Sequence, residues 1–228
     1  MVVAERTTGL AAWPQLATTS EVANAKQPAA TRNVTFMSQN PVTYRRFPGE
    51  QRWHEVPLPP FEVRRVDTTE AFRRSIAEIT ALPKDDLAFL ERRLDALEDA
   101  QSDVRYVLPP GLLQGDPHHR NALHHGGSAV LCDWDTACVG QPQLDLVTVE
   151  IHCRRFDYGL SHYQEFADRY GFDVTSWQGY PVLSGLRELR MITTNVRRAS
   201  AGSPTLAEVR RRIEGLQSGH VQLGWNIL

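Results

Sequence analysis

Long apolar runs are missing from this sequence. No stretch approaches the roughly 18 consecutive apolar residues that a membrane-spanning helix needs. Near the N-terminus, Glu5 and Arg6 stand where an export signal would have its apolar core. We therefore expect a cytoplasmic protein that has no membrane partner.

Cysteine is scarce and charge is nearly balanced. The three cysteines, Cys132, Cys138 and Cys153, are odd in number and show no CxxC spacing. Reduced thiols in a cytoplasmic protein are the simplest interpretation. The formal net charge is -2 and the apolar fraction is 41%. This composition is typical of a soluble globular protein, and it gives no reason to expect a nucleic-acid partner.

Lysine is rare throughout, and glycine is rare in the first half. Lys26 and Lys84 are the only lysines, and arginine supplies the other basic residues. Before Gly111 the sequence has just two glycines, Gly9 and Gly49. A glycine-rich phosphate-binding loop therefore cannot be written in this half.

The composition changes near residue 60. Residues 1–60 are rich in Ala, Thr, Asn, Gln and Pro and show no sustained period, apart from one short strand expected at Val34–Met37. Three prolines within residues 57–60 close this part as a stiff linker. We expect a poorly ordered N-terminal segment with its linker over residues 1–60, and a folded helical lobe over residues 61–228.

Helical periodicity dominates the second part. Thr68 or Thr69 can cap a helix that continues to about Thr80, and Pro83 opens a stronger, leucine-striped helix. Later helices have clear boundary residues, with Gly171 as a C-cap and Ser203 as a helix start. The apolar stripes of these later helices are Leu144, Val147 and Ile151; Tyr163, Phe166 and Tyr170; Leu183, Leu186 and Leu189; and Leu206, Val209, Ile213 and Leu216.

A β-hairpin is expected within this lobe. Two short apolar runs, Ala122–Leu123 and Ser128–Cys132, flank His-His-Gly-Gly, whose glycines supply the turn. Asp116 comes just before the hairpin, Asn121 lies at its first strand and Asp133 ends its second. The hairpin thus gathers two carboxylates and an amide oxygen, which are ligands that Mg²⁺ prefers. Phosphoryl transfer needs such a set, because one carboxylate accepts the proton of the attacking hydroxyl while bound metal neutralises the phosphates.

Two motifs, in the right order and at a fitting distance, resemble one enzyme family. GDPHHRN resembles the catalytic loop HGDxHxxN of aminoglycoside phosphotransferases and choline-kinase-like proteins. CDWDTACVGQPQLDL resembles the metal-binding segment that follows it in that family. The two motifs span Leu112 to Leu146. The resemblance implies an α+β, protein-kinase-like C-terminal lobe, mostly helical with a catalytic β-hairpin, whose N-terminal lobe is largely missing.

The resemblance also implies residue roles. Asp116 would be the catalytic base, and His118 would organise its loop. Asn121 and Asp133 would hold Mg²⁺ and, through it, the phosphates of ATP.

Three further residues would support the site: Gln114, Asp135 and Asp145. Gln114 stands where the family usually has His. Because an amide has a different hydrogen-bonding geometry from an imidazole, we expect a weakened brace behind the catalytic loop and not an abolished site. Asp145 would bond backbone amides and hold the loop after Asp133 in shape.

Two functions stay open at this point. The first is an ATP- and Mg²⁺-dependent phosphotransferase that acts on a hydroxyl of a small molecule. The second is a catalytically impaired kinase-like remnant that serves as a binding or interaction module, favoured by the lack of a recognisable phosphate loop and lysine. A metal-dependent hydrolase is a distant third. From residue 146 onward there are ten arginines and eight acidic residues, so no acidic excess points to a polycationic aminoglycoside as the acceptor.

Four histidines fall within eight positions and suggest a transition-metal site. Neither a paired cysteine nor an i,i+4 histidine on a helix supports a closed zinc site. We favour the interpretation that two of the four decorate the hairpin turn and that one belongs to the catalytic loop. The four are His118, His119, His124 and His125.

Overall fold

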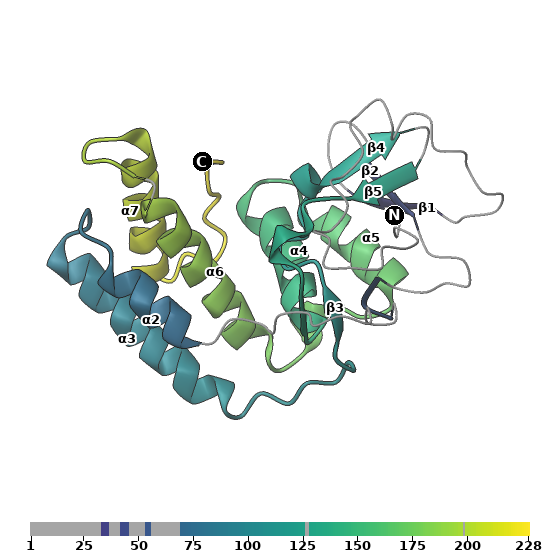
Figure 1. The fold of residues 1–228 in the computed structure, drawn as a ribbon, viewed down its shortest axis with the longest axis horizontal. Helices are drawn as coiled ribbons and strands as arrows, with labels where there is room; N and C mark the ends of the chain where they lie inside the picture. The colour runs from purple at the N-terminus through teal and green to yellow at the C-terminus, as the bar shows by residue number, and fades with distance from the viewer. Residues whose placement is uncertain (1–32, 37–41, 46–52, 56–68, 126–127, 198) are drawn as a thin grey trace, which may run out of the picture.

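Helices dominate the fold. The computed structural model describes residues 33–36, 42–45, 53–55, 69–125, 128–197 and 199–228. In Figure 1, α2, α3, α6 and α7 gather on one side of the molecule, whereas α4, α5 and the strands lie on the other. The α-helices are α2 (Thr69–Ala77), α3 (Lys84–Gln101), α4 (Gln143–Arg155), α5 (Leu160–Tyr170), α6 (Tyr180–Val196) and α7 (Pro204–Gln217).

Three antiparallel strand pairs and four short 3-10 helices complete the described fold. The pairs are β1 (Asn33–Phe36) with β2 (Val42–Arg45), β3 (Gly111–Leu113) with β6 (Cys138–Gly140), and β4 (Ala122–His125) with β5 (Ser128–Leu131). The 3-10 helices are η1 (Trp53–Glu55), η2 (His119–Asn121), η3 (Trp134–Thr136) and η4 (Val174–Ser176). The pair β3–β6 positions the site, because the loop of Asp116 follows β3 and the segment of Asp133 precedes β6.

The helices α2 and α3 lie side by side and pack on α6 (Figure 1). The apolar stripe of α3 faces this contact, and its Leu90 and Leu94 are both 0% exposed. Two aspartates occupy the first turn of α3, where the helix dipole favours negative charge. On α6, a Cβ atom added to Gly185 would lie 2.7 Å from Leu97 Cδ2. A side chain at this position would therefore require Leu97 to shift.

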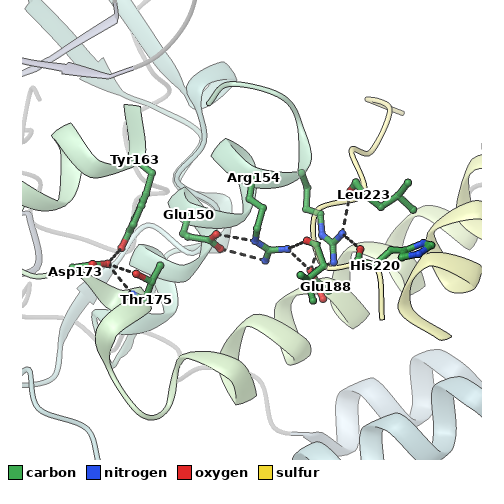
Figure 2. A network of polar contacts seen from close by, with 10 residues as sticks. Glu150, Arg154, Tyr163, Asp173, Thr175, Glu188, His220 and Leu223 are labelled. Carbon is green, nitrogen blue, oxygen red and sulfur yellow. Dashed lines mark hydrogen bonds and ion pairs between the residues drawn. The ribbon is translucent and has the colours of Figure 1, made fainter. Parts of the chain in front are cut away.

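A buried network of ion pairs joins α4, α6 and the C-terminal segment (Figure 2). Arg154 donates to Glu150 at 2.8 Å and to Glu188 at 3.2 Å. Arg155 donates to Glu188 at 2.8 Å and to the carbonyl oxygen of His220 at 3.0 Å. Buried charges are costly unless they are paired and hydrogen-bonded. Because these four charges pair with one another, the network fixes α4 against α6.

The C-terminal segment folds back onto this network. Trp225 is 4% exposed and lies between the guanidinium groups of Arg155, at 4.9 Å, and Arg212, at 4.6 Å from its ring. Glu208 accepts from Arg212 at 3.0 Å and from the backbone N–H of Asn226 at 2.9 Å. Trp225 and Asn226 are therefore part of the packed structure.

Most of the expected elements are confirmed. The hairpin, the helices after Thr69 and Pro83, the left-handed Gly171 at φ 78° and the Ser203 cap all occur as predicted. The first helix ends at Ala77 rather than near Thr80, because a tight turn follows in which Ile79 N–H donates to the Ile76 carbonyl. The pairing of β3 with β6 was not predicted, since strands of three residues show no periodicity.

The expected strand in the N-terminal segment is present as β1. The proline linker lies outside the described residues, and the boundary near residue 60 stays a prediction. Among the helices of the described ranges, none has both the length and the hydropathy needed to span a bilayer.

Candidate active site

The loop that carries Asp116 begins with a tight turn after β3. Gly115 adopts φ 89°, a left-handed conformation that favours glycine. A Cβ atom at this position would collide with the carbonyl oxygen of Thr136. The Thr136 hydroxyl in turn donates to the carbonyl oxygen of Gln114 at 2.9 Å. The strand pair thus brings the loop of Asp116 against the segment that follows Asp133.

Gln114 links these two segments through its side chain. It is 0% exposed. Its Oε1 accepts from the backbone N–H of Asp116 at 2.7 Å, and its Nε2 donates to the carbonyl oxygens of Cys132 at 2.9 Å and Asp133 at 2.6 Å. Both ends of the amide are therefore used. The brace that we expected to be weak consists of three hydrogen bonds from one buried side chain.

Asp145 anchors the same loop from α4. Its side chain is 1% exposed and accepts from the backbone N–H groups of Gln114 at 2.8 Å and Gly115 at 3.0 Å. His54 of η1 adds a contact from Nε2 to Asp145 Oδ2 at 3.1 Å, and its Nδ1 lies 2.8 Å from the Tyr170 hydroxyl. The carboxylate thus bonds backbone amides of the Asp116 loop, and the expected hold on the loop after Asp133 stays a prediction.

Asp116 is surrounded by basic side chains. Its Oδ1 accepts a hydrogen bond from Nη2 of Arg187 on α6, and its Oδ2 lies 3.4 Å from Nε2 of His118. Partial burial raises the pKa of Asp116, but the Arg187 guanidinium and the His118 imidazole outweigh it and hold the pKa well below its usual range. The carboxylate is 35% exposed. It is therefore ionised at neutral pH and accessible to a hydroxyl group.

Asn121 and Asp133 each carry a side-chain oxygen, and a backbone hydrogen bond links Asn121 to the residue before Asp133. The Cys132 N–H donates to the carbonyl oxygen of Asn121 at 2.7 Å, so the residue before Asp133 is tied to Asn121. Asn121 Nδ2 donates to the carbonyl oxygen of Asp116 at 3.0 Å. Because its nitrogen is committed, the Oδ1 atom of Asn121 is the end left for a ligand. Asp133 is exposed and adopts the left-handed conformation, with φ 56°.

This donor set fits a hard divalent cation. An amide oxygen and a carboxylate are typical Mg²⁺ ligands when substrate phosphates and water complete the shell. Within the described residues, no group of three or more His, Cys, Asp or Glu side chains could hold a metal ion by itself. The metal-binding role of Asn121 and Asp133 stays a prediction.

The remaining predicted residues lie close to this site. His118 accepts from the backbone N–H of Arg120 at 3.2 Å, which orders the loop around Asp116. Asp135 is exposed in η3, and no hydrogen bond joins it to the residues that the structure describes. Its supporting role stays a prediction. The side chains of His124 and His125 lie outside the described part.

Three residues near the site were not predicted: His54, His152 and Arg187. His152 stacks on His118 with ring centroids 4.8 Å apart. Burial, together with the nearby positive groups, lowers the pKa of His152 to about 2 and that of His119 to about 4. These residues come from η1, α4 and α6, which are distant in sequence from the loop. For Arg187 the sequence held one signal: this arginine lies inside the leucine-rich stretch Leu183–Leu189, where a buried charge needs a partner.

Comparison with protein families decides the assignment. Residues 45–186, more than half of the 228 residues, match the profile described as "Phosphotransferase enzyme family" (APH). The chain belongs to this family. The matched range includes both motifs that carried the resemblance, so the family resemblance is confirmed. No curated protein matches the phosphotransferase chain in sequence.

Solved structures share the kinase-like fold of this phosphotransferase family member. Amicoumacin kinase hAmiN, in complex with AMP-PNP, Ca²⁺ and Ami, matches with a TM-score of 0.55 and 16% identity over 73% of this chain and 56% of that chain. A choline/ethanolamine kinase family protein from Mesorhizobium loti matches with a TM-score of 0.52 and 13% identity, over 68% of this chain and 55% of that chain. Aminoglycoside phosphotransferase APH(4)-Ia matches with a TM-score of 0.50 and 16% identity, over 66% of this chain and 52% of that chain. The chain spans little more than half the length of each, and the likeness confirms the predicted fold.

Proposed function

We propose that the protein transfers the γ-phosphoryl group of ATP to a hydroxyl of a small molecule, with Mg²⁺ as the metal. One observation carries this proposal. The side chain of Gln114 bonds the backbone of Asp116 at 2.7 Å and of Asp133 at 2.6 Å, so a candidate base and a candidate metal ligand are held in fixed relation. Phosphoryl transfer depends on such positioning more than on covalent chemistry by the protein.

Asp116 is the residue that receives the acceptor. Its carboxylate is ionised and partly exposed, so it can accept a hydrogen bond from the hydroxyl and orient the oxygen toward the γ-phosphorus. The new O–P bond forms as the bond between the γ-phosphorus and the β–γ bridging oxygen breaks, and ADP leaves. The hydroxyl proton passes to Asp116 and then to solvent. A carboxylate with a depressed pKa is a weak base, so Asp116 acts mainly by orientation until the O–P bond has largely formed.

Asn121 Oδ1 and the Asp133 carboxylate would hold the metal. When bound, Mg²⁺ neutralises the charge that develops on the phosphates. The chain itself fixes these two ligands, through the bond from Asn121 Nδ2 to the Asp116 carbonyl and the bond from the Cys132 N–H to the Asn121 carbonyl.

The test is a phosphoryl-transfer assay followed by ³¹P NMR. The protein is incubated with MgATP and a panel of hydroxylated small molecules, and a phosphate monoester signal that grows with ADP is the expected result. Asp116→Asn removes the proton acceptor and should lower the rate by at least about 100-fold. Asp168→Asn, an exposed change on α5, should leave the rate unaltered. An equal rate in Asp116→Asn and the unmodified protein would overturn the role of Asp116.

A second function, a kinase-like module that binds without transfer, predicts a different result from the same assay. Such a module would bind MgATP and give no monoester with any acceptor. The pairing of Asp116 with Arg187 is the observation that favours it, because an ion pair competes with the acceptor for the carboxylate. A carboxylate has about four lone-pair positions, however, and leaves room for the hydroxyl beside the guanidinium.

A further inference from the structure

Arg187 lies beside the candidate base, and its donors are not all used. Its side chain is 13% exposed. Nη2 donates to Asp116 Oδ1, and Nη1 makes a long contact of 3.4 Å with the carbonyl oxygen of Gly115. Nε is buried and has no hydrogen-bond partner among the described residues. A guanidinium has five N–H donors in a planar fork, and leaving them unpaired in a buried place is costly.

Nδ1 of His152 also lacks a hydrogen-bond partner among the described residues. The structure has seven buried side-chain atoms without a partner among the described residues, and two of them belong to residues that act on Asp116: Nδ1 of His152 and Nε of Arg187. His152 and His118 stack at 4.8 Å, and His118 faces the carboxylate. Nε of Arg187 always carries a hydrogen, so a ligand with acceptor atoms would complete its hydrogen bonding.

The carboxylates on the neighbouring helices have partners other than Arg187. The carboxylates of α4 and α6 are Asp145, Glu150 and Glu188. Asp145 accepts hydrogen bonds from backbone N–H groups and contacts His54. Glu150 and Glu188 pair with Arg154 and Arg155. Their negative charge is therefore already compensated. Asp116 balances the charge of Arg187, but the remaining N–H donors of the planar arginine fork match the geometry of a carboxylate or a phosphate.

We propose that Arg187 is a specificity-determining residue that binds an anionic group of the acceptor, so that the substrates are hydroxylated compounds carrying a carboxylate or a phosphate monoester. This inference rests on the proposed function, because it names the class of acceptor for the same site. The anionic group bonds the free donors of Arg187, and the hydroxyl of the same molecule reaches the Asp116 carboxylate.

The test is a binding titration without nucleotide, read by the side-chain NMR signals of His118 and His152. Three probes are compared at constant ionic strength in sodium chloride: glycerate, glycerol 3-phosphate and glycerol. At least one of the two anions is expected to shift both histidine signals saturably, and glycerol is not. In Arg187→Met, the loss of a charged hydrogen-bond donor should weaken this binding at least about tenfold. Arg187→Lys keeps the charge without the fork and should show an intermediate affinity.

Arg197→Met is the matched control, since Arg197 is exposed at the C-terminal end of α6. It should bind the anions as the unmodified protein does. Two results would overturn the inference: glycerol shifting the histidine signals as strongly as the anions, or Arg187→Met binding them with unchanged affinity. If Arg187→Met does not fold, the comparison of glycerate with glycerol in the unmodified protein decides. A failure of the proposed function would appear separately, as an absence of MgATP binding and of monoester formation.

Discussion

Gln114 and Asp133 are joined by a hydrogen bond of 2.6 Å from the Gln114 side-chain amide to the Asp133 carbonyl oxygen. The other end of the same amide holds the backbone N–H of Asp116 at 2.7 Å. Glutamine is thus able to brace two loops at once, because an amide carries a donor and an acceptor on one short side chain. A neutral imidazole also has one of each, but they point in different directions.

Gln114→Leu should lower the free energy of unfolding by roughly 2–4 kcal/mol. The substitution leaves the N–H of Asp116 and the carbonyl oxygens of Cys132 and Asp133 without this partner. A fully buried unpaired group costs about 1–3 kcal/mol, and the partial exposure of these three lowers their combined cost. Urea denaturation followed by circular dichroism gives the value. Gln141→Leu is a matched control, because Gln141 Oε1 has no partner among the described residues. Equal effects of the two changes would contradict the bracing role.

Asp145→Asn should destabilise the protein by about 1–3 kcal/mol. Asp145 now accepts hydrogen bonds from the backbone N–H groups of Gln114 and Gly115. In the variant the new amide nitrogen would face one of these N–H groups, so one buried donor loses its acceptor. Asp157→Asn is the control: Asp157 is exposed at φ 57°, a conformation that Asn also tolerates. A stability for Asp145→Asn within about 0.5 kcal/mol of the unmodified protein, the range of ordinary surface changes, would contradict the anchor.

Stability should fall as the pH is lowered from about 7.5 to about 5.5. The pKa values of His152 and His119 are about 2 and about 4 in the folded protein, and both return to about 6.5 on unfolding. The unfolded state therefore binds more protons below about pH 6.5. The free energy of unfolding therefore decreases as the pH is lowered, with a limiting slope of about 1.4 kcal/mol per pH unit for each histidine.

His152→Phe tests this assignment. Phenylalanine can keep the stack between His118 and Phe156, and it removes the titrating nitrogen atoms. Urea denaturation at pH 7.5, 6.5 and 5.5 should show about half the slope of the unmodified protein in this variant. An unaltered slope would mean that His152 does not contribute.

Trp225→Ala should cost roughly 3–5 kcal/mol, because it opens a cavity between two guanidinium groups in the packed C-terminal segment. Trp225→Phe retains an aromatic face for both arginines and should cost less. Thermal unfolding of these variants and of Ile227→Ala, at a 56% exposed position, gives the comparison. A Tm for Trp225→Ala equal to that of Ile227→Ala would show that the segment is not part of the cooperative fold.

The sequence predicted the helical lobe and the hairpin well, because their signals are local. Leucine spacing in α3, Gly171 and Ser203 as caps, and the glycines of the hairpin turn each act within a few residues. Local pattern also placed the motif residues Asp116, Asn121 and Asp133 on one loop and one hairpin, and their roles stay a prediction.

The rest could not be read from local patterns. The partners of Asp116 and Asp145 include Arg187 and His54, which are 71 and 91 residues away in the chain. Such pairs arise only when α6 and η1 pack against the loop, and no periodicity encodes which polar side chain will meet which. The strength of the Gln114 brace likewise depends on the backbone of Asp133, which the tertiary fold brings within reach.

The most direct test of the central claim is a calorimetric titration of MgATP into the purified protein and into Asp133→Ala. Asp168→Ala serves as the control for loss of an acidic residue far from the site. The account predicts binding with a Kd of about 1 mM or tighter, a free energy of about 4 kcal/mol or more, that is lost in Asp133→Ala and kept in Asp168→Ala. Equal affinity for MgATP in Asp133→Ala and the unmodified protein, or no binding in either, would contradict it.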